Sequence, residues 1–413
     1  MRSTTFTTVG LACSLALALT ACGSDDEERD GSGGGTGGGT LRIGVLTSLS
    51  GPAAAASEGA VDGIEARFAV YEADGGECAG DLDLEVTVAD DQSSPQGALS
   101  GIQKLVQQDE VYAVIAESGL FFGASQWAVT QGAGTPVIGG AFDGAPEWRQ
   151  IPDVPNLFPN FTVPDYDTVH STAGDYFASH GATRVAGVGY ASPSSQAGLA
   201  NGLASIEAAG IETVYSNDSV QFGSTDVGAI VLNIIDSGAD SLYLTINPDT
   251  AFAILAGLRQ ANHPMDLVSS PTGYGADLLG NPTAVELAQG VSFTSSFAPV
   301  ELDTDATRHL SDALREHAGI ESGIPGFFTA QGWFGADLFL HGLEAAGCDS
   351  SQAEFISTLR ASTTWDAGGL FPAPIPMDDV TYDQQCQYYV TLEGEEFVPV
   401  EDASPLCGEP IDD

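Results

Sequence analysis

The stretch VYAVIAESGLFFGASQWAVTQGAGTPVIGGAFD, residues 111–143, decides the fold of this chain. Its apolar run at 111–116 has the length and the β-branched content of a buried strand. A helix is expected over 122–131, followed by glycines and by a second apolar run at 137–138. Both runs stop in loops of small residues. Because ligands of open α/β sheets bind beyond the carboxyl ends of the strands, we expect this stretch to form half of a ligand-binding cleft.

Strands and helices alternate on both sides of this stretch. Before it, strands are expected at 41–46 and 82–89, and helices at 53–71 and 94–108. After it, strands are expected at 184–190, 211–215, 241–246 and 267–270, with a helix between each pair and two longer helices at 304–317 and 329–346. This alternation is typical of doubly wound parallel sheets.

The N-terminus has the features of an export signal. Arg2 is the only charge before a short apolar run at 9–19, which ends in Leu-Thr-Ala-Cys. The run is too short to span a bilayer, and residues 1–21 are predicted to be a signal peptide. The ending resembles a bacterial lipobox, so Cys22 is predicted to be the lipidated first residue of the mature chain; the alternative is an ordinary secretory signal cleaved nearby. Residues 22–40 are predicted to be a flexible, acidic, Gly-rich tether.

The chain is strongly acidic. Asp and Glu number 57 against 11 Lys and Arg, which gives a formal net charge of −46. A nucleic-acid-binding surface needs a basic face, so this class of function is excluded. Direct adhesion to anionic lipid is disfavoured for the same reason. The acids are spread along the chain, which indicates a solvated surface instead of an acidic tail.

Six cysteines occur, and Cys13 would leave with the signal peptide. With Cys22 lipidated, an even set remains for disulfides, with three possible pairings: Cys78, Cys348, Cys386 and Cys407. Cys386 and Cys407 flank a strand-like pair at 388–392 and 397–400, so we favour a bridge between them, which leaves Cys78 to pair with Cys348. No C-x-x-C spacing is present, and a zinc site is not expected.

Three extended passages interrupt the alternation, at 148–167, 290–299 and 371–376, and two of them are rich in proline. They divide the mature chain into two α/β lobes built from non-contiguous pieces. The first lobe is predicted to comprise residues 41–160 and 291–372, and the second 161–290 and 373–413. The predicted fold is therefore two doubly wound Rossmann-like lobes joined by a three-strand hinge.

Here the sequence resembles a known family, the type I periplasmic binding proteins, and within it the branched-chain amino acid (Leu/Ile/Val) binding proteins of ABC transporters. The resemblance is carried by LRIGVLTSLSGPAAAASEG at the start, AVIAESG followed by TPVIGG, LRQAN at 258–262, GVSFTSSF at 290–297 and TAQGWFGADLFLHGLEAAG at 329–347. It implies a small-molecule ligand held between two lobes that close on it, and ABC permease subunits as partners.

The resemblance also implies a set of ligand-binding residues. In that family, small-residue loops of the first lobe hold the ligand's polar end through hydroxyls and backbone N–H groups at helix N-termini, where the helix dipole stabilises an anion. The matching positions in the first lobe are Ser48, Ser50, Ser118, Gly119, Phe121, Phe122, Ala141, Phe142 and Asp143. The second lobe would contribute Ser195, Gln196, Asn247 and Tyr274, and Phe328 stands where the family places a wall of the side-chain pocket.

Several positions depart from the family pattern. Alanines at 53–56 replace an expected aromatic, Ser195 replaces a tyrosine, and Asp143 occupies a loop where a hydroxyl is common. These changes predict an amphipathic ligand whose amine or amide end faces Asp143. Simpler roles remain open for some residues: Ser118 as a helix cap, Asp143 as a turn former, and one of Phe121 and Phe122 as a core residue.

No catalytic signature is present: the sequence lacks a G-x-S-x-G elbow, a Walker loop and an H-E-x-x-H pair. The six histidines are scattered, so no enzyme, cofactor or metal site is expected. The sequence predicts a monomeric solute-binding lipoprotein of an ABC importer, outside the cytoplasm and attached to the membrane only by its lipid. The alternative is a receptor of the same fold that passes ligand information to a separate signalling protein.

Overall fold

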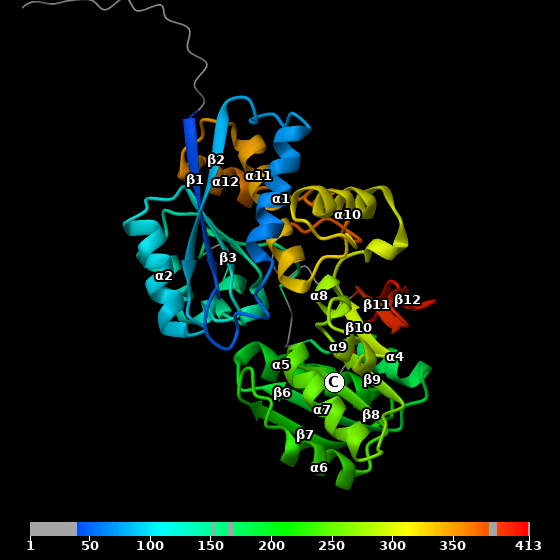
Figure 1. The fold of residues 1–413 in the computed structure, drawn as a ribbon. Coiled ribbons are helices and arrows are strands. Elements are labelled where there is room, and N and C mark those ends of the chain that lie inside the picture. The colour runs from blue at the N-terminus through cyan, green and yellow to red at the C-terminus, as the bar shows by residue number, and fades with distance from the viewer. Residues whose placement is uncertain (1–38, 151–152, 164–167, 380–385, 412–413) are drawn as a thin grey trace, which may run out of the picture. The chain divides into compact units, whose positions relative to one another are not determined.

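The computed structural model describes residues 39–150, 153–163, 168–379 and 386–411. The predicted signal peptide, Cys22 and nearly all of the predicted tether lie outside these residues. Within them, two sheets form, each with helices on both faces (Figure 1).

The first sheet is parallel, with the strand order β2-β1-β3-β4-β5. Its strands are β1 Gly39–Thr47, β2 Leu82–Asp90, β3 Ala113–Glu117, β4 Val137–Gly139 and β5 Leu157–Pro159. Its helices are α1 Ala60–Ala73, α2 Pro95–Gln107, α3 Ser125–Thr130, α10 Asp305–His317, α11 Phe327–Ala346 and α12 Gln352–Arg360. In Figure 1, α2 covers one face of this sheet, and α1 with α11 covers the other.

The first sheet is buried on both faces because its strands are apolar at consecutive positions. All five residues of β3 are buried. Ile115 belongs to the core beneath α1 and α11, whereas its neighbour Val114 packs in the core with α2. Continuous apolar strands of this kind are characteristic of parallel sheets with helices on both faces. The apolar run at 111–116 was expected to form a buried strand, and it does so as β3, at the centre of the sheet.

The second sheet has the order β12-β11-β10-β9-β8-β6-β7, with β13 paired to β11. Its strands are β6 Arg184–Tyr190, β7 Glu212–Val220, β8 Ser241–Thr245, β9 Leu267–Ser270, β10 Val291–Ser295, β11 Cys386–Glu393, β12 Glu396–Pro399 and β13 Leu406–Cys407. Its helices are α4 Thr172–Ser179, α5 Pro193–Ala208, α6 Gly228–Ser237, α7 Pro248–Gln260, α8 Ala276–Leu279 and α9 Pro282–Leu287. Strands β6 to β10 are parallel, and β11 and β12 run antiparallel to their neighbours.

Short 3₁₀ segments connect several of these elements: η1 Phe121–Gly123, η2 Ala141–Asp143, η3 Pro146–Arg149, η4 Val300–Leu302 and η5 Ala367–Gly369. Segments η1 and η2 follow the ends of β3 and β4. Segment η1 and helix α3 replace the single helix expected at 122–131, because Gly123 lies directly against Pro95 at the start of α2. The chain must turn there to let the two backbones pass.

Three boundaries differ from the sequence expectation. Gly39 and Thr40, assigned to the tether, are the first residues of β1 and pair with β2. β10, assigned to the first lobe, pairs in parallel with β9 and belongs to the second sheet. Ile375 and Met377, assigned to the second lobe, donate backbone hydrogen bonds to Trp365 and Ser362, which follow α12. In each case, main-chain hydrogen bonds to a distant segment decide which lobe the residues belong to, and no local sequence pattern reveals these bonds.

Both favoured disulfides are present. Cys386 pairs with Cys407 across the strands β11 and β13, and Cys78 pairs with Cys348. The second bridge joins the loop after α1 to the end of α11, over a sequence separation of 270 residues. It therefore links the early and late pieces of chain that build the first lobe.

α1 and α11 pack with their backbones in direct contact. A Cβ added to Gly63 would lie 2.0 Å from the carbonyl oxygen of Thr329, and a Cβ on Gly332 would lie 2.1 Å from that of Ala60. No side chain fits at either position unless the helices separate. The contact matters for function because α11 also carries part of the cavity described below.

Gly63→Ala is therefore expected to lower the free energy of unfolding by roughly 3 kcal/mol, since overpacking a close contact forces backbone shifts. Urea unfolding measures the change. Gly228→Ala is the matched control: Gly228 lies at the start of α6 with nothing near its Cβ position, and the substitution should be neutral or stabilise by up to about 1 kcal/mol. Equal midpoints for Gly63→Ala and the wild type would contradict the packing argument.

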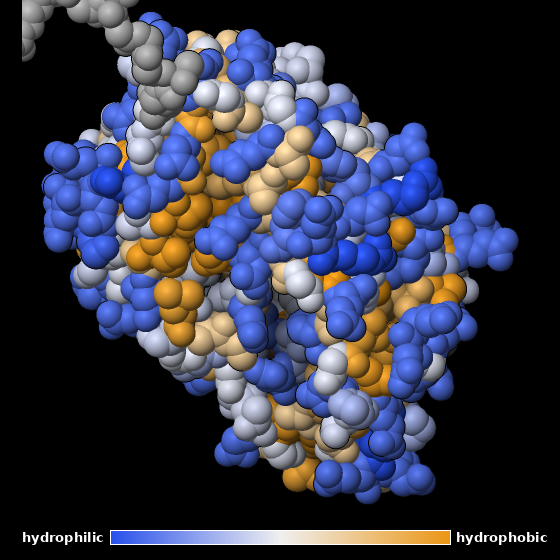
Figure 2. Space-filling model, turned by 45° about the horizontal axis from the view of Figure 1, so that its top comes forward, coloured by the Kyte–Doolittle hydropathy of each residue, from blue (hydrophilic) through white to orange (hydrophobic). Residues whose placement is uncertain are grey.

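The surface is mainly hydrophilic on the face drawn in Figure 2, with apolar residues interspersed. Leu49 and Leu232 are the large apolar side chains that stand most exposed among the described residues. In the same part of the chain, no helix combines the length and the apolar character needed to cross a bilayer.

Candidate functional site

The main candidate site is a cavity of about 430 Å³ lined by loops from both sheets. Gly119 and Phe142 reach it from the loops after β3 and β4. Ser192, Asn247 and Pro271 reach it from the loops after β6, β8 and β9. The cavity therefore lies beyond the carboxyl ends of the strands, where ligands of open α/β sheets bind.

The wall from the first sheet and its helices is aromatic. Phe142 lies at its centre, with its ring centroid 6.1 Å from that of Phe161 and 5.4 Å from those of Phe327 and Phe328. Leu120, Ala53 and Ala56 extend this apolar surface. Stacked and edge-to-face rings of this kind bind a flat or aliphatic ligand body through dispersion and loss of water.

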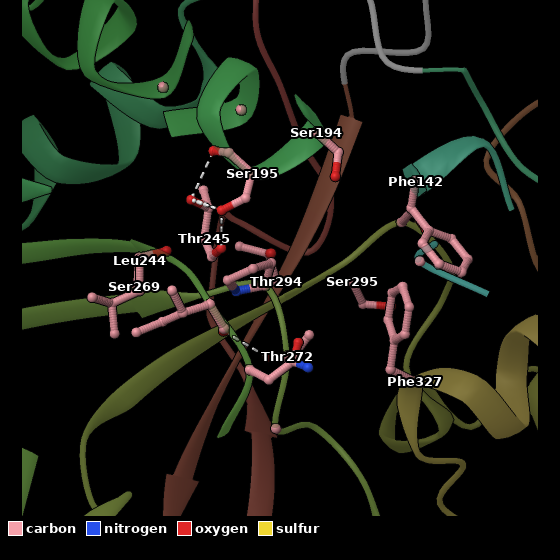
Figure 3. A pocket seen from close by; sticks show the side chains of 18 of the residues that line it. Phe142, Ser194, Ser195, Leu244, Thr245, Ser269, Thr272, Thr294, Ser295 and Phe327 are labelled. Carbon is pink, nitrogen blue, oxygen red and sulfur yellow. Dashed lines mark hydrogen bonds between the residues drawn. The ribbon is translucent and has the colours of Figure 1, made fainter. Parts of the chain in front are cut away.

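The wall from the second sheet is rich in hydroxyl groups. Figure 3 shows Ser195 and Thr245 on the opposite side of the view from Phe142 and Phe327. The Ser195 hydroxyl accepts a hydrogen bond from the Tyr190 N–H (2.6 Å) and donates to the Thr245 carbonyl (2.5 Å), so it is committed to the fold. Further hydroxyls on this wall belong to Ser194, Ser269, Thr272, Thr294, Ser295 and Ser296.

The first turn of α5 opens into this wall. Pro193 begins the helix, no side chain caps it, and its first turn contains no acidic residue. The Ser194 hydroxyl has no hydrogen-bond partner among the described residues, and in Figure 3 it points toward the open space. In a chain of net charge −46, an uncapped helix N-terminus with a free hydroxyl is a local site of positive potential.

The described part of the lining holds no carboxylate, ammonium or guanidinium group, and His170 is its one histidine. Among the residues of the described chain that line the cavity, none is Asp, Glu, Lys or Arg. Tyr274 contributes only its ring, because its hydroxyl donates to Glu301 (2.7 Å) and accepts from the Val300 N–H (2.9 Å). Burial, and then the neighbouring Glu301 carboxylate, raises the pKa of Tyr274 well above its usual range, so the phenol stays neutral.

Six of the predicted site residues come together here. They line one cavity although they come from distant parts of the sequence: Gly119, Phe142, Ser195, Asn247, Tyr274 and Phe328. Phe142 and Phe328 supply apolar surface, and the hydroxyls of Ser195 and Tyr274 are already hydrogen-bonded within the protein. The remaining predicted residues lie outside the lining.

Four of those remaining residues are hydroxyl or amide groups with structural partners. Ser48 and Ser118 both donate to the buried Asp91 carboxylate, the former at 2.7 Å. Ser118 also accepts a hydrogen bond from the Leu120 N–H, which closes a turn, but it caps neither η1 nor α3. Ser50 donates to Asp90 (2.6 Å), and Gln196 donates to the Asp218 carbonyl (3.1 Å). Asp90 and Asp91, at the end of β2, thus hold the loop after β1 in place. Ser48 and Ser50 of that loop had been expected to contact the ligand.

Asp143 does not face the cavity, contrary to expectation. Its carboxylate is fully buried and accepts a hydrogen bond from the Trp148 indole N–H (2.6 Å). Burial raises the pKa of Asp143 to about 7. The turn in η2 directs this side chain into the core while its neighbour Phe142 reaches the cavity. An amine facing Asp143 is therefore ruled out by geometry.

Three apolar predictions also lie in the core. Phe121 is buried with its ring 5.3 Å from Trp148, Phe122 packs at the edge of the core around α2, and Ala141 is buried beside it. Neither Phe121 nor Phe122 lines the cavity, although one of them was expected to do so. The 3₁₀ segment η1 turns both side chains away from the end of β3.

Sequence reasoning missed several lining residues. Phe161 and Phe327 complete the aromatic wall, and Thr294 lies at the end of β10, which had been taken for a crossing. Gln331 could have been found: it is a polar side chain on a helix that is otherwise apolar on nearly all sides. A buried polar residue in such a helix needs an explanation.

A buried polar group lies behind this wall. The Asn160 side-chain amide donates to Glu117 Oε1 (2.7 Å) and to the Gln331 carbonyl (2.8 Å). Burial raises the pKa of Glu117 well above its usual range, and the hydrogen bond from Asn160 lowers it only in part. The Glu117 side chain at the end of β3 is thus held in the core, where burial favours its neutral form.

A second cavity, of about 380 Å³, differs in character. Its polar groups pair with each other: Arg67 forms an ion pair with Asp337 (2.7 Å), and the Trp365 indole N–H donates to the same carboxylate (2.8 Å). No group of three or more metal-binding side chains is arranged to hold a metal among the described residues. The first cavity remains the candidate site.

Comparisons with known proteins identify the family and similar folds. A sequence profile described as periplasmic binding protein matches residues 40–391. The fold is similar to a solute-binding protein of an ABC transporter from R. palustris in complex with benzoate, with 19% identity, a TM-score of 0.72, and coverage of 91% of this chain and 98% of that chain. No curated protein sequence matches the chain.

Two further structures share the fold. A branched-chain amino acid ABC transporter protein from Thermus thermophilus with bound valine has 16% identity and a TM-score of 0.73, over 90% of this chain and 97% of that one. A fatty acid ABC transporter substrate-binding protein from Thermomonospora curvata has 16% identity and a TM-score of 0.71, over 89% and 92%.

Proposed function

Because the chain belongs to the periplasmic binding protein family, a family of solute-binding proteins and not of enzymes, we propose that it is the solute receptor of an ABC importer. We further propose that its ligand is a small carboxylate with an apolar body and no ammonium group. Proteins of similar fold bind benzoate, valine and, by description, fatty acids, so the fold leaves the ligand open. The choice rests on the cavity of this chain.

The observation that carries the proposal is the absence of acidic side chains from the described part of the lining. An α-amino acid brings an ammonium group, and a buried cation without a carboxylate partner is strongly destabilised. A carboxylate makes no such demand, because helix N-termini and hydroxyls can hold an anion. We place it at the first turn of α5, beside the Ser194 hydroxyl, with the apolar body against Phe142 and Phe327.

We also propose that ligand binding favours a closed arrangement of the two lobes, and that this form docks on the permease. The ligand would contact the aromatic wall of one lobe and the hydroxyls of the other, which gives it a higher affinity for the closed form. Lipid attachment at Cys22 would hold the protein as a monomer at the outer face of the membrane. The sequence 9–22 and the family's extracytoplasmic role support this arrangement.

A thermal-shift screen tests the ligand class. Benzoate, hydroxybenzoates and hexanoate form one group, and leucine, valine and benzamide the other. A carboxylate present at 100 times its dissociation constant should stabilise the protein by roughly 2.7 kcal/mol. The two amino acids should give no shift, since their ammonium group would be buried without a partner. A shift with valine or leucine and none with any simple carboxylate would overturn the proposal.

Two variants test whether the carboxylate binds in the cavity lined by Phe142. Phe142→Ala removes the central ring of the aromatic wall and should abolish the shift given by an active carboxylate. Phe252→Ala removes a half-buried ring of α7 outside the lining, and should retain that shift even if it lowers the melting temperature. Equal loss in both variants would mean that the effect is on folding and not on the cavity.

A further inference from the structure

Gln331 has features that the fold alone does not explain. It is 1% exposed, lines the cavity, and lies on α11 one turn after Phe327. Its side-chain Oε1 has no hydrogen-bond partner. Buried polar atoms without partners are rare in folded proteins and cost free energy. An unpaired amide at a cavity wall is therefore explained most simply by a partner that arrives with the ligand.

The backbone of Gln331 already serves the structure, whereas its side chain does not. The Gln331 carbonyl accepts a hydrogen bond from Asn160, and Asn160 is itself held by Glu117. This buried pair fixes α11 against the end of the first sheet. The side-chain amide takes no part in it, so an apolar residue of similar length would preserve the helix and its packing.

The surroundings define what the amide can recognise. The aromatic wall around it offers rings and methyl groups, and apart from Ser57 no other polar side chain on this wall lines the cavity among the described residues. An amide carries both an acceptor oxygen and donor N–H groups, so it can pair with a hydroxyl in either orientation. It supplies no charge, and so it matches a neutral group better than an ion.

We propose that Gln331 determines specificity by pairing with a hydroxyl group on the apolar body of the ligand. The inference rests on the proposed function and narrows it. The preferred ligands are carboxylates that carry a hydroxyl away from the acid group, such as a hydroxylated aromatic acid. The carboxylate lies at the first turn of α5, and the hydroxyl lies at α11.

Calorimetric titration with benzoate, 3-hydroxybenzoate and 4-hydroxybenzoate tests this proposal. The wild-type protein should bind one hydroxybenzoate about 10- to 100-fold more tightly than benzoate, because an unpaired buried amide disfavours the ligand without the hydroxyl. Gln331→Met keeps the length of the side chain and removes its polar atoms. This variant should bind hydroxybenzoate more weakly and benzoate within about threefold of the wild-type affinity. The ratio of the two affinities should therefore come close to one.

Gln103→Met is the matched control, because Gln103 is a half-buried glutamine of α2 that does not line the cavity; this variant should keep the wild-type ratio. The inference is overturned if the wild type shows no preference for a hydroxybenzoate, or if Gln331→Met weakens all three acids equally. The preference of the wild-type protein for a hydroxybenzoate over benzoate is measured without any variant, so the inference can be tested even if Gln331→Met does not fold. If none of the acids binds the wild type and an amino acid does, the proposed function itself fails.

Discussion

Replacing Cys78 and Cys348 together with alanine is expected to lower the free energy of unfolding by roughly 5 kcal/mol. The bridge closes a loop of 270 residues, and in the chain-entropy description a disulfide stabilises the fold by restricting the unfolded chain over the loop it closes. Cys78 is also buried, so loss of its sulfur leaves unfilled space next to α1. Urea unfolding of the variant and the wild type measures the difference.

The second disulfide supplies the control. Cys386 and Cys407 are separated by 21 residues, and their replacement by alanine should cost about 3 kcal/mol on the same description. The expected order is therefore a larger loss for the Cys78–Cys348 pair. A larger loss for the Cys386–Cys407 pair would show that local packing around the sulfurs, and not the length of the closed loop, determines the contribution of each bridge.

Loss of the Cys78–Cys348 disulfide should also affect ligand binding. This bridge joins the loop after α1 to the end of α11, and α11 carries Phe327, Phe328 and Gln331 of the cavity. Its removal should weaken binding of an active carboxylate as well as lower stability. The Cys386–Cys407 variant should bind with an affinity close to that of the wild type.

The free energy of unfolding is expected to fall by roughly 3 kcal/mol between pH 5 and pH 8 because of Asp143 alone. Burial raises the pKa of this carboxyl from 3.8 to about 7. Between these two values the folded state holds a proton that the unfolded state has lost. The stabilising contribution is therefore complete below about pH 4 and disappears as the pH rises through about 7. Glu117, whose pKa burial also raises, acts in the same direction.

Asp143→Asn isolates this effect. The asparagine oxygen can still accept the hydrogen bond from Trp148, and no charge has to be buried at any pH. The variant should be more stable than the wild type at pH 8 and show a smaller decrease from pH 5 to pH 8 in urea unfolding. An unchanged decrease would mean that Asp143 ionises in the folded protein near its ordinary pKa.

Asp240→Asn provides a control, because the pKa of Asp240 is lowered in the folded protein whereas that of Asp143 is raised. Partial burial raises the pKa of Asp240, but hydrogen bonds from Thr183 and from the Arg184 N–H outweigh it and leave the pKa below its usual range. Its stabilising contribution is present above the unfolded pKa and is lost only as the pH falls below about 4. This variant should therefore be less stable at both pH 5 and pH 8, with the same slope between them as the wild type.

The order of elements was accessible from sequence because strand and helix periods are local properties. The runs at 113–117 and 137–139 form strands, Ser94 caps α2 as its position before Pro95 suggests, and the even cysteine set pairs as favoured. Gly119 and Phe142 line one cavity because the strands that precede them are neighbours in one parallel sheet.

The identity of the remaining lining residues was less accessible. Ser48, Ser118 and Asp143 lie at strand ends, as a ligand contact would. The two hydroxyls nevertheless pair with Asp91, and Asp143 is buried with one carboxylate oxygen paired to Trp148. Whether a polar group is free or already paired depends on residues distant in sequence. Gln331 is a similar case. The sequence of α11 shows a polar residue in an apolar stretch, but it does not show that this residue lines the cavity.

The sequence by itself determined that this chain is an acidic α/β protein of two sheets with a cleft at the strand ends, because hydrophobic period, turn residues and net charge are properties of the chain as written. Only the tertiary structure decided that the described part of the cavity lining holds no acidic side chain. Asp143, the acid expected to face the ligand, is buried in the core with Glu117, and Asp90 and Asp91 pair with the loop hydroxyls of Ser50 and Ser48. The proposed ligand class rests on these contacts, and such contacts exist only when distant segments are packed together.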